Sequence, residues 1–315
     1  MRIGLDAMGG DFAPKAAIIG AILAQKELPS EDRIVLFGHK DIILEHLLEN
    51  GGNPELFEIV HAEDVIDMNE KPVKALLKKP NSSLAVGFAY LKDGKIDSFA
   101  SAGSTGAMLV GTMQSVGTIE GVLRPCLAAV LPKDKEGVSV LVDVGVNPDS
   151  KPEVIYQFGL LGSVYSQNAL GIDNPKVGLL SNGEEEEKGN AQVQNAHQLM
   201  KATNDFNFVG NVEPIELFKN NVDVIVCDGF IGNIILKQTE AFARTVAKRG
   251  FVDDFIQRFN YEIYGGLPLL GANGTVIIGH GISNEKAIKN MLLQSKNIFV
   301  SKINEMIEAT LLNNN

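Results

Sequence analysis

The chain has 315 residues, of which 45% are hydrophobic, enough for one large domain or two closely joined domains with a core. Its formal net charge of −11 argues against a nucleic-acid-binding protein, because such proteins neutralise phosphates with an excess of Lys and Arg. No apolar run approaches the ~18 residues that a membrane span needs, and no secretory signal is recognisable around Asp6. We therefore expect a cytoplasmic protein with no nucleic acid as a partner.

The two cysteines, Cys126 and Cys227, lie far apart and lack the CxxC spacing of a zinc or redox site. Cys227 lies in an apolar run and Cys126 follows Arg124-Pro125, so both are predicted to be packed side chains rather than nucleophiles. Their isolation suits a reducing compartment. The sequence predicts neither a metal site nor a cofactor.

Short β-branched runs alternate with longer amphipathic stretches, which is typical of a parallel sheet covered by helices. Strands are predicted at Ile3–Asp6, Ile34–Phe37, Phe57–Val60, Ser98–Ala100, Leu127–Leu131, Val138–Val142, Val177–Leu180, Phe206–Val209 and Val222–Cys227. Helices are predicted from Pro14 to about Lys26, at about residues 231–260, and once or twice between Ser283 and Leu312. Because no linker divides the chain, we expect residues 1–315 to form a single unit, with two lobes that share one sheet.

Six polar or glycine-rich loops follow predicted strands. They are Asp6–Asp11, Ser101–Gly106, Asp143–Asn147, Ser181–Asn190, Asp228–Asn233 and Gly279–Gly281. In open α/β sheets, ligands bind beyond the carboxyl ends of the strands. One such loop usually makes only a turn, but six together predict one large polar site.

The loop that contains Gly103, Ser104, Thr105 and Gly106 is the first candidate for binding phosphate. It precedes a predicted helix at Ala107–Val116, so its N–H groups and hydroxyls would lie at the positive end of that helix. Alternatively, Ser104 or Thr105 only caps the helix, because capping and anion binding use the same geometry.

Two further side chains are candidates for catalysis. Lys188 follows the acidic run Glu184–Glu187, whose carboxylates could hold it while its ammonium faces an anion. The run could also be a solvated surface, or bind magnesium, although no metal-loop spacing supports the latter. His280 lies between two glycines, where it is either a general acid or base or an ordinary loop residue.

Several common catalytic motifs are absent from the sequence, including GxSxG, GxxxxGK[ST], HExxH and a GxGxxG after a strand. Serine hydrolases, P-loop nucleotide enzymes and zinc proteases are therefore improbable. A mechanism without a protein nucleophile is favoured.

Taken in order, the motifs resemble the PlsX family of acyl-acyl-carrier-protein:phosphate acyltransferases. The most specific is GLDAMGGDFAP, followed by SAGSTGA, VDVGVN, VGLLSNGEEEEKGN, FVGNVE, VDVIVCDGFIGN and GGLPLLGANGTVIIGHG. The resemblance implies an isopropylmalate-dehydrogenase-like fold, a three-layer Rossmann-like α/β sandwich whose mostly parallel sheet has helices on both faces. Two departures are Ser181-Asn182, where Asn-Ile is more usual, and a shorter stretch between Asn233 and Gly265, which weakens the inference of membrane attachment.

The resemblance also implies partners and roles. Acyl carrier protein and inorganic phosphate would be the substrates of a cytoplasmic homodimer working beside the membrane, with the product passed to a membrane glycerol-3-phosphate acyltransferase. The resemblance locates the site without assigning each step; our hypothesis is that Lys188 and residues 103–106 hold phosphate and that His280 assists the departing thiolate. The thioester pocket and the rest of the substrate site would be formed by Asn233, Asp6, Gly9, Gly10, Asp11, Asn147 and Asp228.

Three alternative functions remain open at this point. A decarboxylating dehydrogenase of the same fold would use a nicotinamide cofactor and magnesium. A phosphotransacetylase would use acyl-coenzyme A as its donor. A non-catalytic scaffold would bind the carrier protein without consuming its thioester.

Two surface patterns have competing interpretations. Lys71, Lys74 and Lys78 lie three and four residues apart around a predicted helix that begins near Pro72, and form either a docking patch for the acidic carrier or a merely solvated face. The recurrence of phenylalanine at positions 251, 255 and 259 predicts a short aromatic stripe, which would pack in the core or a dimer, cover the acyl chain, or contact a membrane.

Overall fold

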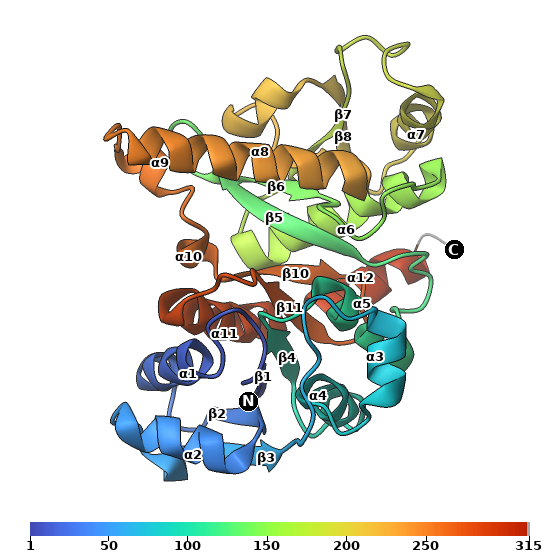
Figure 1. Cartoon of the computed structure of the whole chain (residues 1–315). Coiled ribbons are helices and arrows are strands. Elements are labelled where there is room, and N and C mark those ends of the chain that lie inside the picture. Colours follow the sequence, from blue (N-terminus) through green and yellow to red (C-terminus); the bar gives the residue numbers. More distant parts are fainter. Residues whose placement is uncertain (314–315) are drawn as a thin grey trace. The chain divides into compact units, whose positions relative to one another are not determined.

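A computed structural model describes residues 1–313, and the chain divides into two compact units. The first unit consists of Met1–Gly117 and Tyr261–Val300, and the second consists of Thr118–Asn260 together with the segment that starts at Ser301. In Figure 1 the first unit is drawn in blue, cyan and dark red and the second mainly in green, yellow and orange. That the two lobes share one sheet stays a prediction.

The sheet of the first unit is almost entirely parallel. Its strands, in spatial order, are β3 (Phe57–His61), β2 (Arg33–Gly38), β1 (Arg2–Asp6), β4 (Ser98–Ser101), β11 (Thr275–Gly279) and β10 (Gly266–Leu270). Only β10 is antiparallel to its neighbour β11. Because the other strands run in the same direction, the loops that follow β1, β4 and β11 emerge at the same edge.

Helices cover this sheet on both faces, with α1 and α11 on one face and α4 on the other (Figure 1). The helices of the first unit are α1 (Lys15–Glu27), α2 (Lys40–Glu49), α3 (Pro72–Lys78), α4 (Ser83–Lys92), α5 (Thr105–Ser115), α10 (Tyr261–Tyr264) and α11 (Glu285–Val300). Close packing depends on glycine: a Cβ on Gly20 of α1 would lie 2.5 Å from the Cβ of Ile288 in α11. A 3₁₀ turn at Pro54–Leu56 precedes β3.

The second unit repeats this architecture with a smaller sheet. Its strands, in spatial order, are β5 (Cys126–Pro132), β6 (Val138–Val142), β9 (Val224–Val226), β7 (Lys176–Leu180) and β8 (Asn207–Val212), and only β5 is antiparallel to its neighbour. Its helices are α6 (Pro152–Leu170), α7 (Ala191–Lys201), α8 (Gly229–Lys248), α9 (Asp254–Gln257) and α12 (Ile303–Asn313), with a 3₁₀ turn at Pro214–Phe218. Helix α6 is capped at its carboxyl end by Gly171, which adopts a left-handed φ of 69°. Glycine adopts this conformation without strain because it has no Cβ.

The predicted α/β class, with mostly parallel strands and helices on both faces, is confirmed. Each predicted strand is present, with ends that differ by a few residues. The largest shifts are at β8, which continues to Val212, and at β9, which is shorter than predicted. Two strands were missed, β10 and β11, because Pro268 and the adjacent glycines obscure the strand pattern there.

The prediction of a helical segment at about residues 231–260 is wrong in its second half. Helix α8 ends at Lys248, and Gly250 adopts a φ of 87°, which turns the chain out of the helix. Phe251 lies in the break and is 69% exposed, whereas Phe255 and Phe259 pack edge to face. The aromatic stripe is therefore a pair of rings that also contacts Phe218.

Within residues 1–313, no helix combines the length and the apolar character that crossing a membrane requires. The carboxyl-terminal prediction of one or two helices is confirmed as two, α11 and α12.

Candidate functional site

Three of the predicted loops lie side by side in the first unit, because β1, β4 and β11 are neighbouring parallel strands. The backbone N–H of Asp11 donates to the carbonyl of Gly281, with 2.7 Å between N and O. Gly10 adopts a φ of 108°, and a Cβ there would lie 3.2 Å from the Cβ of Ala102. The loops after β1, β4 and β11 are thus packed backbone against backbone.

A buried carboxylate joins the first two loops. Asp6 is 2% exposed, and its Oδ2 accepts a hydrogen bond from Ser101 Oγ at 2.7 Å. Ser101 Oγ in turn accepts from the N–H of Gly103 at 2.9 Å, while Asp6 Oδ1 accepts from the N–H of Met8 at 3.0 Å. Asp6 was predicted to bind substrate, but its oxygens are used within the protein, which assigns it to positioning the loops.

Burial raises the pKa of Asp6, and hydrogen bonds from Ser101, Ser83 and the backbone of Met8 and Gly9 oppose this rise. Ser101 is therefore positioned by a carboxyl group whose burial away from water costs free energy when it is ionised. Ser101 and Ser83 were not among the predicted site residues. Ser101 reaches Asp6 because β4 pairs with β1, and Ser83 reaches it from the start of α4, so neither contact can be seen in the local sequence.

Glycine is required where these loops touch. A Cβ on Gly9 would collide with Asp6 Oδ2 and would lie 2.6 Å from Ser101 Oγ and 2.8 Å from the backbone N of Gly103. Real Cβ atoms do not approach so closely, so any larger residue would displace the Asp6 carboxylate or the loop after β4. Gly9 and Gly103 thus keep the two loops in contact.

The predicted phosphate loop leads into α5. Ser104 is 7% exposed and caps the helix, since its Oγ accepts from the N–H of Ala107 at 3.4 Å. The capping role of Ser104 is thereby confirmed. The N–H groups of Thr105 and Gly106 donate to no acceptor within residues 1–313, and Thr105 is exposed. This end of α5 therefore offers two unused donors and a positive dipole to an anion.

His280 follows β11 in the same cluster and is half-buried. Its ring stacks edge to face on Tyr261, with 5.5 Å between the ring centroids. Asp11, in the loop after β1, is exposed and lies beside Gly281. The first unit thus brings together Asp6, Gly9, Gly10, Asp11, Gly103, Ser104, Thr105, Gly106 and His280.

The second unit contains a similar buried carboxylate, Asp143, directly after β6. Its Oδ1 accepts from the N–H groups of Leu127 at 3.0 Å and Val146 at 3.3 Å. Its Oδ2 accepts from both the backbone N–H and the side-chain amide of Asn147, at 2.7 and 2.9 Å. Burial raises the pKa of Asp143, and the bonds from Asn147 and the backbone oppose the rise.

The predicted substrate ligand Asn147 is committed to this network. Its amide nitrogen also donates to the carbonyl of Pro125 at 2.8 Å, and its backbone carbonyl accepts from the N–H of Gly229. Asp228, another predicted ligand, caps α8 by accepting from the N–H of Ile231 at 2.9 Å. Both side chains shape the loops of this unit, and within residues 1–313 the second carboxylate oxygen of Asp228 accepts from no protein donor.

The start of α8 packs against the loop after β6 without intervening side chains. A Cβ on Gly232 would collide with the carbonyl oxygen of Asp143. A Cβ on Gly145 would lie 3.4 Å from Cγ of Asn233, so the side-chain amide of Asn233, predicted to border the thioester, lies over that loop. Asn233 is half-buried and thus accessible in part.

Lys188 lies in the loop after β7 and is exposed. Its Cγ would be 2.8 Å from a Cβ on Gly183, so the stem of the side chain crosses this glycine. The expectation that the acidic run holds Lys188 is wrong: Glu186 pairs with Lys201, and within residues 1–313 no carboxylate pairs with Lys188. The ammonium group therefore remains available to an anionic ligand.

Asn182 explains one departure from the family pattern. Its Oδ1 accepts a hydrogen bond from the N–H of Gly189 at 2.8 Å, which closes the acidic loop on itself. Gly189 has a φ of 89° and lies against Val193. The bond between Asn182 and Gly189 thus ties together the two ends of the segment that carries Lys188.

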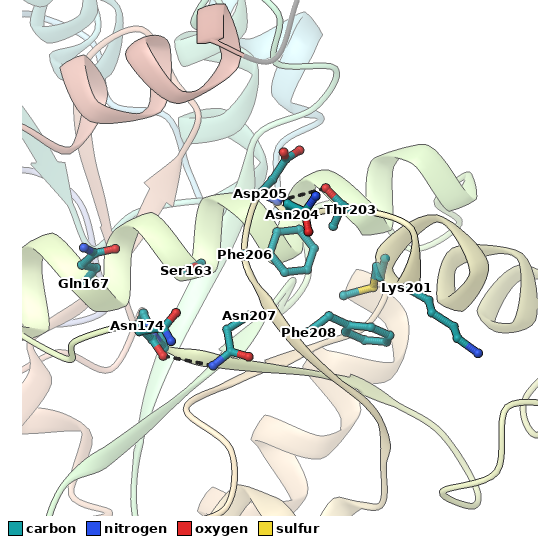
Figure 2. A pocket seen from close by; sticks show the side chains of 12 residues that line it. Ser163, Gln167, Asn174, Lys201, Thr203, Asn204, Asp205, Phe206, Asn207 and Phe208 are labelled. Carbon is teal, nitrogen blue, oxygen red and sulfur yellow. Dashed lines mark hydrogen bonds between the residues drawn. The ribbon is translucent and has the colours of Figure 1, made fainter.

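A separate pocket of about 490 Å³ lies at the other edge of the second unit's sheet, where β7 and β8 begin (Figure 2). It contains none of the predicted site residues, and Asn207 donates to the carbonyl of Asn174 across its floor. Within residues 1–313, no group of three or more His, Cys, Asp or Glu side chains could hold a metal ion. That all six predicted loops build one site stays a prediction.

Comparison with known proteins relates the chain to lipid synthesis. Residues 1–249 match the family model described as fatty acid synthesis protein. Over 332 aligned positions the chain is 41% identical to a phosphate acyltransferase of Clostridium botulinum, covering 99% of this chain and 98% of that protein. It is 42% identical to a phosphate acyltransferase of Caldicellulosiruptor bescii, with 96% of each chain covered.

Solved structures similar to this one include two phosphotransacetylases. The protein from Streptococcus pyogenes has a TM-score of 0.67 at 17% identity and covers 95% of this chain and 94% of its own. The EutD phosphotransacetylase from Staphylococcus aureus has a TM-score of 0.64 at 16% identity, with 94% of each chain covered. At these identities the likeness concerns the fold.

Proposed function

This chain belongs to the PlsX family of phosphate acyltransferases, and we propose that it transfers a fatty acyl group from acyl carrier protein to inorganic phosphate. It is an acyltransferase of lipid synthesis, and the observation that carries this conclusion is the 41% identity to a phosphate acyltransferase across 99% of the chain. In the reaction, a phosphate oxygen bonds to the thioester carbonyl carbon. The carbon–sulfur bond then breaks, giving acyl phosphate and a thiolate that takes up a proton.

Phosphate would bind at Gly103–Gly106. The unused N–H groups of Thr105 and Gly106 and the exposed Thr105 hydroxyl support this, since they converge at the start of an 11-residue helix. The Asp6–Ser101–Gly103 chain of hydrogen bonds would hold the loop in one shape before phosphate arrives. Lys188 would supply the balancing positive charge.

Phosphate would attack the thioester directly, without an acyl-enzyme intermediate. Both Cys126 and Cys227 are buried, and burial raises the pKa of each thiol well above its ordinary value. The thiolate is the nucleophilic form, so neither cysteine is suited to accept the acyl group. His280 would protonate the leaving thiolate, while Gly9, Gly10 and Asn233 would border the thioester.

The remaining parts of the proposal concern the cell. The enzyme would be a cytoplasmic homodimer that works close to the membrane. Its acyl phosphate would be consumed by a membrane glycerol-3-phosphate acyltransferase for phospholipid synthesis.

Incubation of the purified enzyme with an acyl-carrier-protein thioester and labelled phosphate tests the proposal. We expect label to enter a product that hydroxylamine converts to a hydroxamate, in proportion to the thiol released. Activity with acyl-coenzyme A but not with the carrier thioester would instead indicate a phosphotransacetylase. Binding of the carrier without phosphate-dependent loss of its thioester would indicate a scaffold.

A further inference from the structure

Helix α3 borders the proposed phosphate site within the first unit. A Cβ on Gly106 would lie 2.7 Å from Cγ of Pro72, the first residue of α3. Just before the helix, Met68 reaches the loop after β11, where its Cε would lie 2.9 Å from a Cβ on Gly281. The segment from Met68 to Lys78 therefore touches two of the loops that form the site.

The outward face of α3 carries three lysines. Ala75 and Leu76 are buried and face the protein, so Lys74 and Lys78, four residues apart, share the opposite face, with Lys71 beside them at the helix cap. All three lysines are exposed, and within residues 1–313 none forms an ion pair.

The neighbouring acid does not neutralise these lysines. Glu70 is bound to Lys79, with 2.6 Å between the carboxylate oxygen and the ammonium nitrogen. The ammonium of Lys79 also donates to the carbonyl of Val65 at 2.7 Å, which turns this lysine inward. The hydrogen bond from Lys79, and more weakly the charge of Lys78, lower the pKa of Glu70. Lys71, Lys74 and Lys78 thus form a cluster of three cations outside any ion pair within residues 1–313, on a chain whose formal net charge is −11.

Apolar side chains are exposed beside the lysines. Leu77 is 71% exposed and Val73 is 50% exposed, and both lie on α3 next to Lys74. Met68 is 44% exposed at the edge nearest the site. A free phosphate or a nucleotide would use the cations alone, whereas an acidic protein surface uses cations at the rim and apolar contacts between them.

We propose that Lys71, Lys74 and Lys78, with Val73 and Leu77, form the docking face for the acidic carrier protein that delivers the acyl thioester. The inference rests on the proposed function and adds the place where the partner binds. Docking on α3 puts the carrier next to Pro72 and hence next to the phosphate loop. A tethered thioester can then enter the site without the carrier itself entering it.

The test is the double reversal Lys74→Glu with Lys78→Glu, assayed with the acyl-carrier-protein thioester and with a small acyl-pantetheine thioester. At low ionic strength we expect KM for the carrier thioester to rise about tenfold or more, and the rise to shrink in high salt, because exposed charges are screened. KM for the small thioester should stay within about twofold of wild type, since that substrate makes no contact with the patch. Equal changes for both substrates, or no change for the carrier, would overturn the docking face.

Lys26→Glu with Lys92→Glu is the matched control. Both lysines are exposed, make no ion pair within the described chain, and end helices that lead to the amino ends of β2 and β4. The net charge changes equally, yet carrier KM should stay near wild type, and a matching rise would also refute the proposal. Should the α3 double variant unfold, Lys74→Gln with Lys78→Gln repeats the test. If the wild-type enzyme fails to consume the carrier thioester, the proposed function fails instead.

Discussion

Each unit of this enzyme has a buried aspartate at the carboxyl end of a strand: Asp6 is the last residue of β1, and Asp143 directly follows β6. Burial raises the pKa of both, and both lie against glycines that leave no room for a Cβ. Their partners differ. Asp6 is bound by hydroxyl groups and backbone, whereas Asp143 accepts four bonds from N–H groups.

This difference separates two tasks. The chain of bonds from Asp6 runs through Ser101 to Gly103 and ends at the start of α5, where two N–H groups remain unused. The Asp143 network ends on Asn147 and Pro125, within the protein. Under the proposed function the first unit would bind the anion, while in the second unit the buried aspartate fixes loops and the exposed Lys188 would supply a cation.

Removing Lys188 gives the sharpest test of this division. We expect Lys188→Ala to lower kcat/KM by about 10²–10³-fold, the usual effect of losing one preorganised group that stabilises developing charge. Stability should change by less than about 0.5 kcal/mol, because the side chain is exposed. Steady-state kinetics and urea unfolding measure the two effects.

Lys201→Ala is the control for Lys188, since Lys201 contacts the same acidic run through Glu186. Its loss should cost at most about 1 kcal/mol of stability and leave turnover unchanged. Near-normal activity in a folded Lys188→Ala enzyme would show that Lys188 does not balance the charge of phosphate.

Gly9→Ala tests whether the Asp6 network must keep its shape. The added methyl group would force Asp6, Ser101 or Gly103 to move, so activity should fall about 10–100-fold, with a loss of about 1–3 kcal/mol in unfolding free energy. Phosphate KM and thermal unfolding report the two effects. Gly94→Ala, at a φ of 65° with no neighbour within 4 Å, should lose only stability. Equal activity losses in both variants would contradict a role for loop shape.

The aspartates themselves should differ when changed to asparagine. A hydroxyl can rotate to accept from an amide, so Ser101 can adapt in Asp6→Asn. Both oxygens of Asp143 accept from N–H groups, so whichever oxygen the NH₂ group of Asp143→Asn replaces, a donor then faces a donor. At least one buried N–H group is left without an acceptor. Asp143→Asn should therefore be less stable than Asp6→Asn by about 2 kcal/mol in urea unfolding. Equal stabilities would show that the two networks are equivalent.

The raised pKa of Asp6 also gives a sign for pH dependence. An acid with a raised folded-state pKa contributes stability that is fully present below its unfolded pKa of about 3.9 and is lost as the pH rises through the folded value. Asparagine does not titrate. The stability advantage of wild type over Asp6→Asn should thus shrink as the pH rises above about 4, measured by urea unfolding across that range. An advantage that grows with pH would contradict the assignment.

Much of the fold could be predicted because its signals are local. Apolar runs marked the strands, and Pro72 marked the start of α3. The errors are also local: Pro268 concealed β10, and apolar periodicity outweighed Gly250, which breaks the helix after Lys248.

The site was predictable only as a set of loops. The rule that ligands bind at the carboxyl ends of strands predicted where the loops lie, and the glycine-rich and polar motifs identified which loops they are. The bond from Ser101 to Asp6 joins residues 95 positions apart, and it exists because β4 pairs with β1. Strand order of this kind leaves no trace in local sequence, so the exposed Asp11 and the buried Asp6 were predicted to act alike.

The smallest expected effect on activity concerns the two cysteines, which lie beside Asp143 but do not bind its carboxylate. Cys227 Sγ is 3.7 Å from the carbonyl oxygen of Asp143, and Cys126 begins β5. Direct attack by phosphate requires neither thiol, so Cys126→Ala with Cys227→Ala should keep kcat within about twofold of wild type. Each lost sulfur leaves a small void, and together they should lower the unfolding free energy by about 1–3 kcal/mol. Mass spectrometry after mixing with acyl donor in the absence of phosphate completes the test: an acyl group found on either cysteine of the wild-type enzyme, with activity lost in the double variant, would replace direct attack by a two-step mechanism.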